Sequence, residues 1–229
     1  GYSDEQPIHE VTLSNFYIGT YEVTQALYEE VMGSNPVSGD GDGDNNPVYN
    51  VSWYDAVDFC NALSDLEGLT RCYTVDGTTV TCDFSKNGYR LPTEAEWEFS
   101  ARGGNNSNGY TYAGSDIITD VAWYGSNSES EVHEVGTKAA NELGIYDMSG
   151  NLWELCWDWY NSGYYSDSTI TTDPIGPSSG SYRVKRGGCW CGDASSLDNG
   201  GEYCRAACRG LEAPGYGYQI LGFRVVRRP

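Results

Sequence analysis

Four cysteines near the C-terminus carry the most reactive side chains of this sequence. Cys189, Cys191, Cys204 and Cys208 lie in a chain of 229 residues that holds eight cysteines and two histidines. Thiolates bind soft metals and attack electrophiles, but these four have neither the paired CxxC spacing nor the histidine partners of a zinc site. Spacing alone therefore assigns them no metal and no catalytic role.

Histidine and carboxylate chemistry has even less support. His9 and His133 are far apart in the sequence, and no Asp, Ser or Cys constellation surrounds His133, so a histidine-dependent triad is not indicated. Glu94, Glu96 and Glu98 could suggest acid–base catalysis. On a short helix we interpret them instead as helix caps and as partners for neighbouring arginines.

A cation site is one of two interpretations of the turn that precedes Glu154. The carbonyls of Ser149, Gly150 and Leu152 could join the Glu154 carboxylate around a structural calcium ion, which takes backbone and carboxylate oxygens together. A turn in which Glu154 pairs with an arginine fits the spacing equally well. The acidic loop 39–47 lacks the glycine and the closing glutamate of an EF-hand, so we interpret it as an exposed turn.

The cysteines leave the redox state of the chain open. Eight cysteines fit either an exported, oxidised protein or a reduced one with buried thiols. Cys72 and Cys82 flank an apparent hairpin with a turn signal at Asp76-Gly77, and we expect them to form a disulfide across the strands. Cys60 and Cys156 have apolar surroundings in the sequence and are expected to be core thiols.

Two amphipathic segments predict the main helices. Thr24 caps a helix through Met32, and Ser52 begins a helix to about Glu67 in which Asp55 completes a capping box. The second helix is expected to bury the residues that repeat at helical spacing, namely Trp53, Val57, Cys60, Leu63 and Leu66.

A shorter helix, an opening strand and a central apolar block complete the expected elements. Thr93 and Glu96 form a second capping box, and Gly103-Gly104 ends that helix. Residues 8–18 alternate as a strand, and residues 143–160 are the densest apolar block. The side chains expected in the core from these two segments include Val11, Leu13, Phe16, Ile18, Leu143, Ile145, Trp153, Trp157 and Trp159.

Charge and length restrict the classes of partner. A net charge of -20, from 33 acidic and 13 basic residues, disfavours nucleic acid and anionic membranes. With 39% hydrophobic residues, the chain is long enough for one buried core, and we expect a single domain over residues 1–229. No run approaches a membrane-spanning length, and no signal peptide is present.

An irregular segment between residues 189 and 221 is the strongest functional signal. It has no sustained helical or strand period and is bracketed by strand-like sequence at both ends. Segments of this length in a compact domain are uncommon unless functional. Trp190, Tyr203, Tyr216 and Tyr218 among small polar residues are typical of adaptable binding loops. We therefore predict a recognition surface rather than an inert flexible loop.

Five motifs in register resemble the sulfatase-modifying-factor domain of formylglycine-generating enzymes, from about Ile8 to the C-terminus. In order, they are EVTQALYEEVMG, YRLPTEAEWEFSARGG, YDMSGNLWELCWDWY, RVKRGG and GFRVVRRP. The resemblance implies an α+β fold of the C-type-lectin-like class, in the formylglycine-generating-enzyme subclass. Such a fold has a twisted antiparallel sheet, two main helices and long ordered loops.

Activity does not follow from this fold. The resembling enzymes oxidise a substrate cysteine with copper held by two cysteines, and the matching positions here lie near Gly192 and Leu197. Neither is cysteine. Cys191 is one residue away, and Cys204 and Cys208 follow a stretch that looks inserted, so the enzyme would require two register shifts.

The tail also resembles the variable region of proteins diversified by retroelements. In such proteins, rewritten adenine codons place different side chains at fixed surface sites of a C-type-lectin scaffold. The framework residues would be Arg186, Gly187, Gly188, Trp190, Ala194, Leu197, Cys204, Arg205, Arg209, Pro214, Gly222, Phe223 and Arg224. The diversified, ligand-binding residues would be Cys191, Gly192, Asp193, Ser195, Ser196, Tyr203, Cys208, Gly210, Leu211, Glu212, Ala213, Gly215, Tyr216, Tyr218, Gln219 and Ile220.

The resemblances together predict a non-enzymatic protein that binds an unknown protein or other surface ligand through residues 186–226. The alternatives are a copper-dependent formylglycine-generating oxidase and an inactive domain of that family with a fixed protein partner. The leading hypothesis requires no cofactor, favours a monomer, and places the protein on a bacterial cell surface or otherwise exported. The export signal or anchor would then be missing from this chain, which begins at Gly1.

Overall fold

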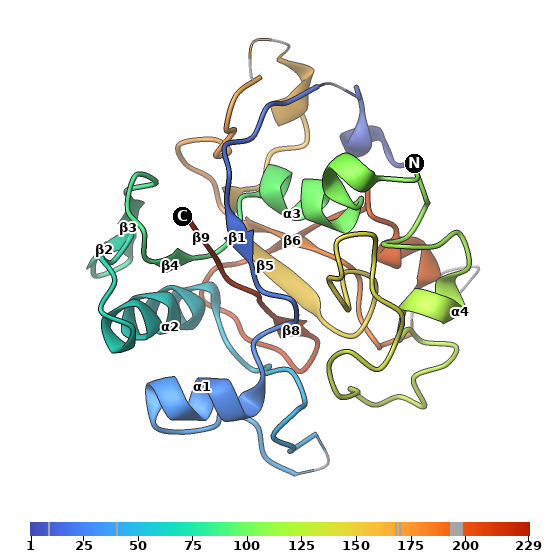
Figure 1. Ribbon diagram of the computed structural model, residues 1–229, viewed down its shortest axis with the longest axis horizontal. Coiled ribbons are helices and arrows are strands. Elements are labelled where there is room, and N and C mark those ends of the chain that lie inside the picture. Colours follow the sequence, from blue (N-terminus) through green and yellow to red (C-terminus); the bar gives the residue numbers. More distant parts are fainter. Residues whose placement is uncertain (9, 40, 168, 170, 193–198) are drawn as a thin grey trace.

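The larger sheet has the strand order β7-β6-β5-β8 (Figure 1). It is built from β5 (Trp153–Trp159), β6 (Arg183–Arg186), β7 (Arg209–Glu212) and β8 (Leu221–Gly222). The β7-β6 and β6-β5 pairs are antiparallel, whereas β8 runs parallel to β5. The computed structural model describes residues 1–8, 10–39, 41–167, 169, 171–192 and 199–229.

A smaller antiparallel sheet joins the two ends of the chain. Its order is β1 (Tyr17–Ile18), β9 (Val226–Arg227) and β4 (Tyr89–Arg90). The expected strand over residues 8–18 is therefore wrong in length. Within the described part of that segment only its last residues pair as a strand, and a single parallel bridge joins Thr12 to Thr172.

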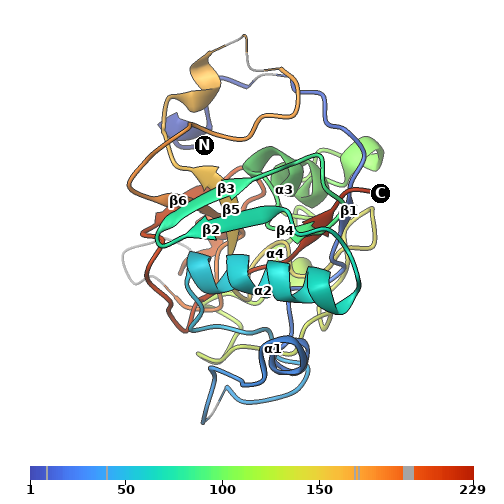
Figure 2. The same cartoon turned by 90° about the vertical axis from the view of Figure 1, so that its left-hand side faces the viewer.

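Local signals placed the main helices correctly. Helix α1 (Gln25–Met32) begins after Thr24, whose side chain accepts a hydrogen bond from the Leu27 amide. Helix α2 (Trp53–Leu66) has the Ser52 capping box, and α1 lies beside it (Figure 2). The shorter α-helices are α3 (Glu94–Ala101) and α4 (Ile118–Val121), and the 3-10 turns are η1 (Ser3–Glu5), η2 (Gly104–Asn106), η3 (Tyr164–Ser166) and η4 (Gly201–Cys204).

No helix among the described residues has the length and apolar character needed to cross a bilayer.

The register of the β2–β3 hairpin contradicts the predicted Cys72–Cys82 disulfide. Strands β2 (Tyr73–Asp76) and β3 (Thr79–Cys82) pair Tyr73 with Cys82, so the turn is centred on Gly77 and Thr78 rather than on Asp76 and Gly77. Cys72 falls opposite the next residue along, because its carbonyl accepts a hydrogen bond from the Asp83 amide at 2.9 Å. A shift of one residue moves a side chain to the other face of a strand, and both cysteines are free thiols.

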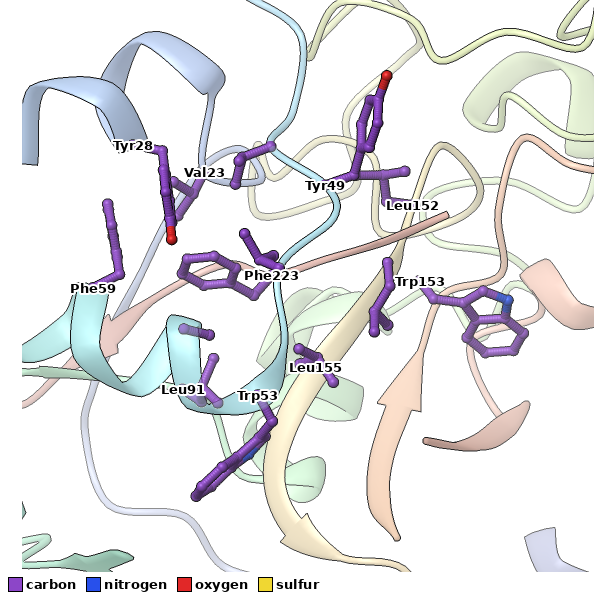
Figure 3. Packing of buried hydrophobic residues seen from close by; sticks show 14 of the residues in the cluster. Val23, Tyr28, Tyr49, Trp53, Phe59, Leu91, Leu152, Trp153, Leu155 and Phe223 are labelled. Carbon is purple, nitrogen blue, oxygen red and sulfur yellow. The ribbon is translucent and has the colours of Figure 1, made fainter. Parts of the chain in front are cut away.

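Aromatic and aliphatic side chains from α2, β5 and the C-terminal segment share one cluster (Figure 3). Trp53, Phe59 and Phe223 are 0% exposed. The rings of Phe59 and Phe223 meet edge to face, with centroids 5.2 Å apart. Phe223 follows β8 directly, so the core holds the C-terminal end of the irregular segment.

Some residues expected in this core lie outside it. Leu66 is 62% exposed because it stands in the last turn of α2, and Leu143 is 41% exposed in a turn before Ile145. Ile145 itself is buried, as predicted. In the opening segment, Val11, Leu13, Phe16 and Ile18 are only half-buried, and Ile18 lies in β1, at the edge of its sheet.

Candidate ligand-binding surface

A pair of glycines turns the chain out of β6. Gly187 and Gly188 have φ angles of 99° and 77°, which residues with a side chain rarely adopt. A Cβ on Gly188 would also lie 2.7 Å from the sulfur of Cys204. The turn therefore needs glycine, and it fixes the point at which the tail, residues 187–220, leaves the sheet.

Trp190 joins separate parts of the tail and the scaffold. Its amide donates to the Asn151 carbonyl at 2.7 Å, and its carbonyl accepts from the Ser128 hydroxyl at 2.8 Å. The indole Nε1 donates to the Gln219 carbonyl at 3.3 Å. Backbone groups thus hold the tryptophan in position whatever side chain stands at residue 219.

Buried arginines hold β6, which precedes the tail, and β7, which lies within it. Arg209, in β7, donates to both carboxylate oxygens of Glu94 at 2.7 and 2.8 Å. Arg186, in β6, is 0% exposed and donates to Glu98 and to the Cys208 carbonyl. Burial alone would raise the pKa of Glu98, but the charges of Arg186 and a neighbouring arginine lower it, so this carboxylate stays ionised as a partner.

The N-terminal segment packs against the same region. The Glu5 carboxylate accepts hydrogen bonds from Arg205 at 2.7 and 3.0 Å, and the Asp4 carbonyl accepts one from Arg209 at 3.0 Å. These contacts join residues about 200 positions apart, and no local pattern in the sequence signals them. They tie the chain ahead of β7 to the first turn of the protein.

Glu154 pairs with an arginine, as the second interpretation of its turn predicted. Both its carboxylate oxygens accept hydrogen bonds from Arg224 at 2.6 Å, and one also accepts from the Trp97 indole at 2.7 Å. All of this lies in a site where Glu154 and Arg224 are 0% exposed. The Glu154 carboxylate, the side-chain ligand expected for calcium, is hydrogen-bonded to Arg224.

The remaining residues of the proposed calcium site also serve internal contacts. The Ser149 hydroxyl donates to the Cys204 carbonyl at 2.8 Å, and the Leu152 amide donates to Glu22 at 3.1 Å. Gly150 takes part in a bridge with Trp123. The described residues contain no cluster of three or more His, Cys, Asp or Glu side chains suited to a metal ion. These contacts use the Ser149 hydroxyl and the Leu152 amide rather than carbonyl oxygens, so a calcium ion at this turn stays a prediction.

The exposed part of the tail presents aromatic rings on an anchored loop. Tyr216 and Tyr218 are 58% and 44% exposed, and their rings stack with centroids 6.1 Å apart. The loop is fixed from below, since the Asn50 amide donates to the Tyr218 carbonyl and the Trp53 amide donates to the Pro214 carbonyl, each at 3.1 Å. These rings offer contact area at a low cost in conformational entropy.

Most of the predicted ligand-binding residues that the structure describes reach solvent. The exposed ones are Gly192, Leu211, Gly215, Tyr216, Tyr218 and Gln219, and the half-buried ones are Cys191, Tyr203, Gly210, Glu212, Ala213 and Ile220. Asp193, Ser195 and Ser196 lie outside the described residues. Cys208 is 1% exposed in the core cluster, so its placement on the surface was wrong.

One residue beside the tail, Lys185, is absent from the predicted site residues. Lys185 donates to Glu212 at 3.0 Å, and its ammonium lies 5.3 Å from the centre of the Trp153 ring. Tyr203 stands next to the same tryptophan, with ring centroids 6.3 Å apart. The alternation of side chains along β6 was the only indication that Lys185 reaches the surface, because Lys185 is the half-buried position between two buried neighbours.

None of the four C-terminal cysteines stands at the two positions expected for the copper pair of the resembling enzymes. Cys191 is bonded to Cys189 in a disulfide. Cys208 is buried, and burial raises the pKa of its thiol to about 11, which disfavours a thiolate. At the first position where an enzyme cysteine is expected, the residue is Gly192. The second, Leu197, lies outside the described residues.

Comparison with known proteins identifies the family. The scaffold and its irregular, anchored tail define a C-type-lectin-like domain, and residues 1–229 match the family model of the sulfatase-modifying factor enzyme 1-like domain. The chain belongs to this family, as its motifs predicted. The α+β fold is likewise confirmed by solved structures.

Three relatives show the range of proteins built on this domain. The solved structure of Treponema denticola variable protein 1 is 40% identical with a TM-score of 0.87, covering 100% of this chain and 89% of that chain. The chaperone protein LppX of Paenibacillus barcinonensis is 39% identical over 86% of this chain and 75% of its own length. The formylglycine-generating enzyme of Streptomyces coelicolor is 34% identical over 79% of this chain and 52% of its own length.

Proposed function

We propose that this protein is a non-enzymatic binder whose tail, residues 187–220, displays a diversified ligand-binding surface. The resemblance to a treponemal variable protein over the whole chain supports this function. The ligand would be a protein or another molecule met outside the cell. The protein would act on a bacterial cell surface or in exported form.

The separation of framework and variable positions is the observation that carries the proposal. Described framework residues such as Arg186, Phe223 and Arg224 are 0% exposed, whereas the exposed tyrosines of the tail make their anchoring contacts through backbone atoms. Side chains can therefore change at those positions without loss of the contacts that hold the backbone. This is the property that a diversified site requires.

The test is to sequence the gene in many clones of one lineage. Diversification predicts substitutions at the codons for Leu211, Tyr216 and Tyr218, with few at the codons for Phe223 and Arg224. A near-duplicate template repeat, with adenines at the varying codons and a reverse transcriptase gene beside it, would support the same conclusion. An invariant tail, or substitutions spread evenly over the gene, would contradict it.

A fixed protein partner is the second candidate. The similarity to a protein named as a chaperone, which nearly equals the similarity to the variable protein, favours it. A fixed partner predicts that the tail does not vary between clones and that alanine at Tyr216 or Tyr218 weakens one defined complex. The clone sequencing described above separates the two candidates.

Formylglycine-generating activity is the enzymatic alternative. It would need two thiolates that converge on a copper ion, and Gly192 stands where one of them is expected. We expect the protein to leave a cysteine-containing peptide unoxidised in the presence of copper and oxygen, as followed by mass spectrometry. Formation of a formylglycine aldehyde would overturn the non-enzymatic proposal.

A further inference from the structure

One acidic loop lies against Trp190, whose indole donates to the Gln219 carbonyl next to Tyr218, and a second acidic loop adjoins the first. The first, residues 125–135, touches the tail because the Ser128 hydroxyl binds the Trp190 carbonyl at 2.8 Å and Gly125 lies directly against Gly192. The second, residues 41–46, is joined to the first by a hydrogen bond from the Val135 amide to the Asn45 carbonyl at 3.0 Å. The two loops therefore form a continuous border next to the tail, which we name the acidic border.

The carboxylates of the acidic border lack a cation partner within the described part of the chain. Its exposed acidic residues are Asp42, Asp44, Glu129, Glu131 and Glu134. None of them forms an ion pair with any of the residues that the structure describes. Their negative charges therefore stand at the edge of the proposed binding surface, where a ligand can meet them.

The basic side chains near the tail already have partners within the protein. Lys185 is paired with Glu212, Arg205 with Glu5, and Arg209 with Glu94. Lys138 lies over the Trp123 ring, with its ammonium 3.9 Å from the centroid, and donates to the Thr119 carbonyl.

The exposed charge beside the tail is therefore strongly negative, in agreement with the net charge of -20 for the chain.

We propose that the partner of this surface is a protein that presents a Lys- or Arg-rich segment. The inference rests on the proposed function and adds the chemical class of its ligand. The faces of Tyr216 and Tyr218 would receive basic side chains through cation–π contacts, and the acidic border would attract the rest of the segment. Complementary charge at the edge of an interface raises the association rate and excludes partners of the wrong sign.

Panning of a phage library of random peptides against the whole protein tests the inference. The expected result is enrichment of peptides with a net positive charge and with Lys or Arg beside apolar residues. Their synthetic copies should bind about tenfold more weakly when salt is raised from about 0.01 M to about 1 M, because the Debye length falls from about 30 Å to about 3 Å.

Matched variants connect the charge effect to the acidic border. We expect the double variant Glu129→Gln and Glu131→Gln to weaken binding of the enriched peptides by about threefold to tenfold. The control, Glu10→Gln with Glu67→Gln, removes the same charge from other exposed positions and should leave binding unchanged. Circular dichroism and thermal melting of both variants check that each remains folded.

The outcomes separate the inference from the proposed function. Peptides that bind through Tyr216 and Tyr218, but are uncharged or acidic and insensitive to salt, overturn the basic partner and leave the binding surface intact. No difference in enrichment between the protein and its Tyr216→Ser, Tyr218→Ser variant overturns the binding surface itself. Basic peptides that lose equal affinity in both charge variants show attraction to the whole acidic protein, which also overturns the inference.

Discussion

Buried ion pairs decide how the tail is held at the scale of single residues. Glu154 and Arg224 lie 70 positions apart and meet where neither is exposed to solvent. Burying two charges is costly, and here the cost is offset by paired hydrogen bonds between the groups and by the additional donor of Trp97. The pair therefore fixes β5 to the segment that follows β8, at the C-terminal limit of the tail.

We expect Arg224→Met to destabilise the protein strongly. Removal of one partner from a buried pair leaves the Glu154 carboxylate without compensation and costs about 3–5 kcal/mol of unfolding free energy. Urea denaturation followed by tryptophan fluorescence measures the loss. The control is Arg71→Met, because Arg71 pairs with Asp65 at the surface, where solvent screening leaves such pairs little net stabilisation. Equal losses in both variants would contradict this account.

Asp147 makes stability depend on pH. It is 3% exposed, and burial raises the pKa of its carboxyl group to about 6. Between the unfolded pKa of about 3.9 and this value, the native state binds more protons than the unfolded state, so stability falls as pH rises through this range. Burial and the charges of Asp147 and Glu154 also raise the pKa of Glu22, which adds to the same trend.

Asp147→Asn is therefore expected to stabilise the protein above about pH 6 by about 1–3 kcal/mol and to have little effect near pH 4. Asparagine tolerates the φ angle of 58° at this position and can still accept the hydrogen bond of the Gly136 amide. Urea midpoints measured at several pH values give the result. Asp42→Asn, at an exposed site, serves as the control, and a gain that is equal at pH 4 and pH 8 would argue against the role of ionisation.

At the scale of elements, the glycine turn after β6 determines the path of the tail. Gly188 combines a positive φ angle with close contact to Cys204, so a side chain there meets both backbone strain and a steric clash. At Gly215, within the tail, an added Cβ would meet no atom within 4 Å, and the φ angle is not positive. The two glycines therefore have different roles in the same segment.

Alanine substitution separates these roles. Gly188→Ala is expected to cost about 1–3 kcal/mol because of the strained backbone and the clash with Cys204. Gly215→Ala should change stability by less than about 1 kcal/mol in either direction. Thermal unfolding followed by circular dichroism compares the two, and a larger effect at Gly215 would refute the assignment of the turn.

At the scale of the whole molecule, the tail and the scaffold share their stabilising contacts. Arg209 joins β7 to α3 through Glu94, and Arg205 joins the tail to the N-terminal segment through Glu5. Phe223 completes the core cluster beside Phe59 of α2. Because these contacts cross between distant parts of the chain, we infer that tail and scaffold fold as one unit.

We therefore expect a single cooperative unfolding transition. Tryptophan fluorescence and far-ultraviolet circular dichroism should give the same midpoint in urea, because loss of the scaffold also removes the anchors of the tail. Protease resistance gives a second measurement, in which cleavage within residues 187–220 should appear only as the whole protein unfolds. Separate midpoints would show that the tail unfolds on its own.

The sequence by itself determined the main helices and the family. Caps such as Thr24 and the Ser52–Asp55 box act within a few residues, so local patterns were sufficient to place α1 and α2. Phe223, which the resemblance placed in the framework, is buried in the core. The half-exposed tyrosines of the tail were likewise expected, because their neighbours cannot form a core.

Only the tertiary structure decided which partners these residues take. It set the hairpin register that separates Cys72 from Cys82, joined Cys189 to Cys191, and placed Cys208 in the core. It also paired the Glu154 carboxylate with Arg224. The hairpin register, the burial of Cys208 and the pairing of Glu154 depend on the packing of distant segments or on a one-residue shift in register, and neither is encoded in local spacing.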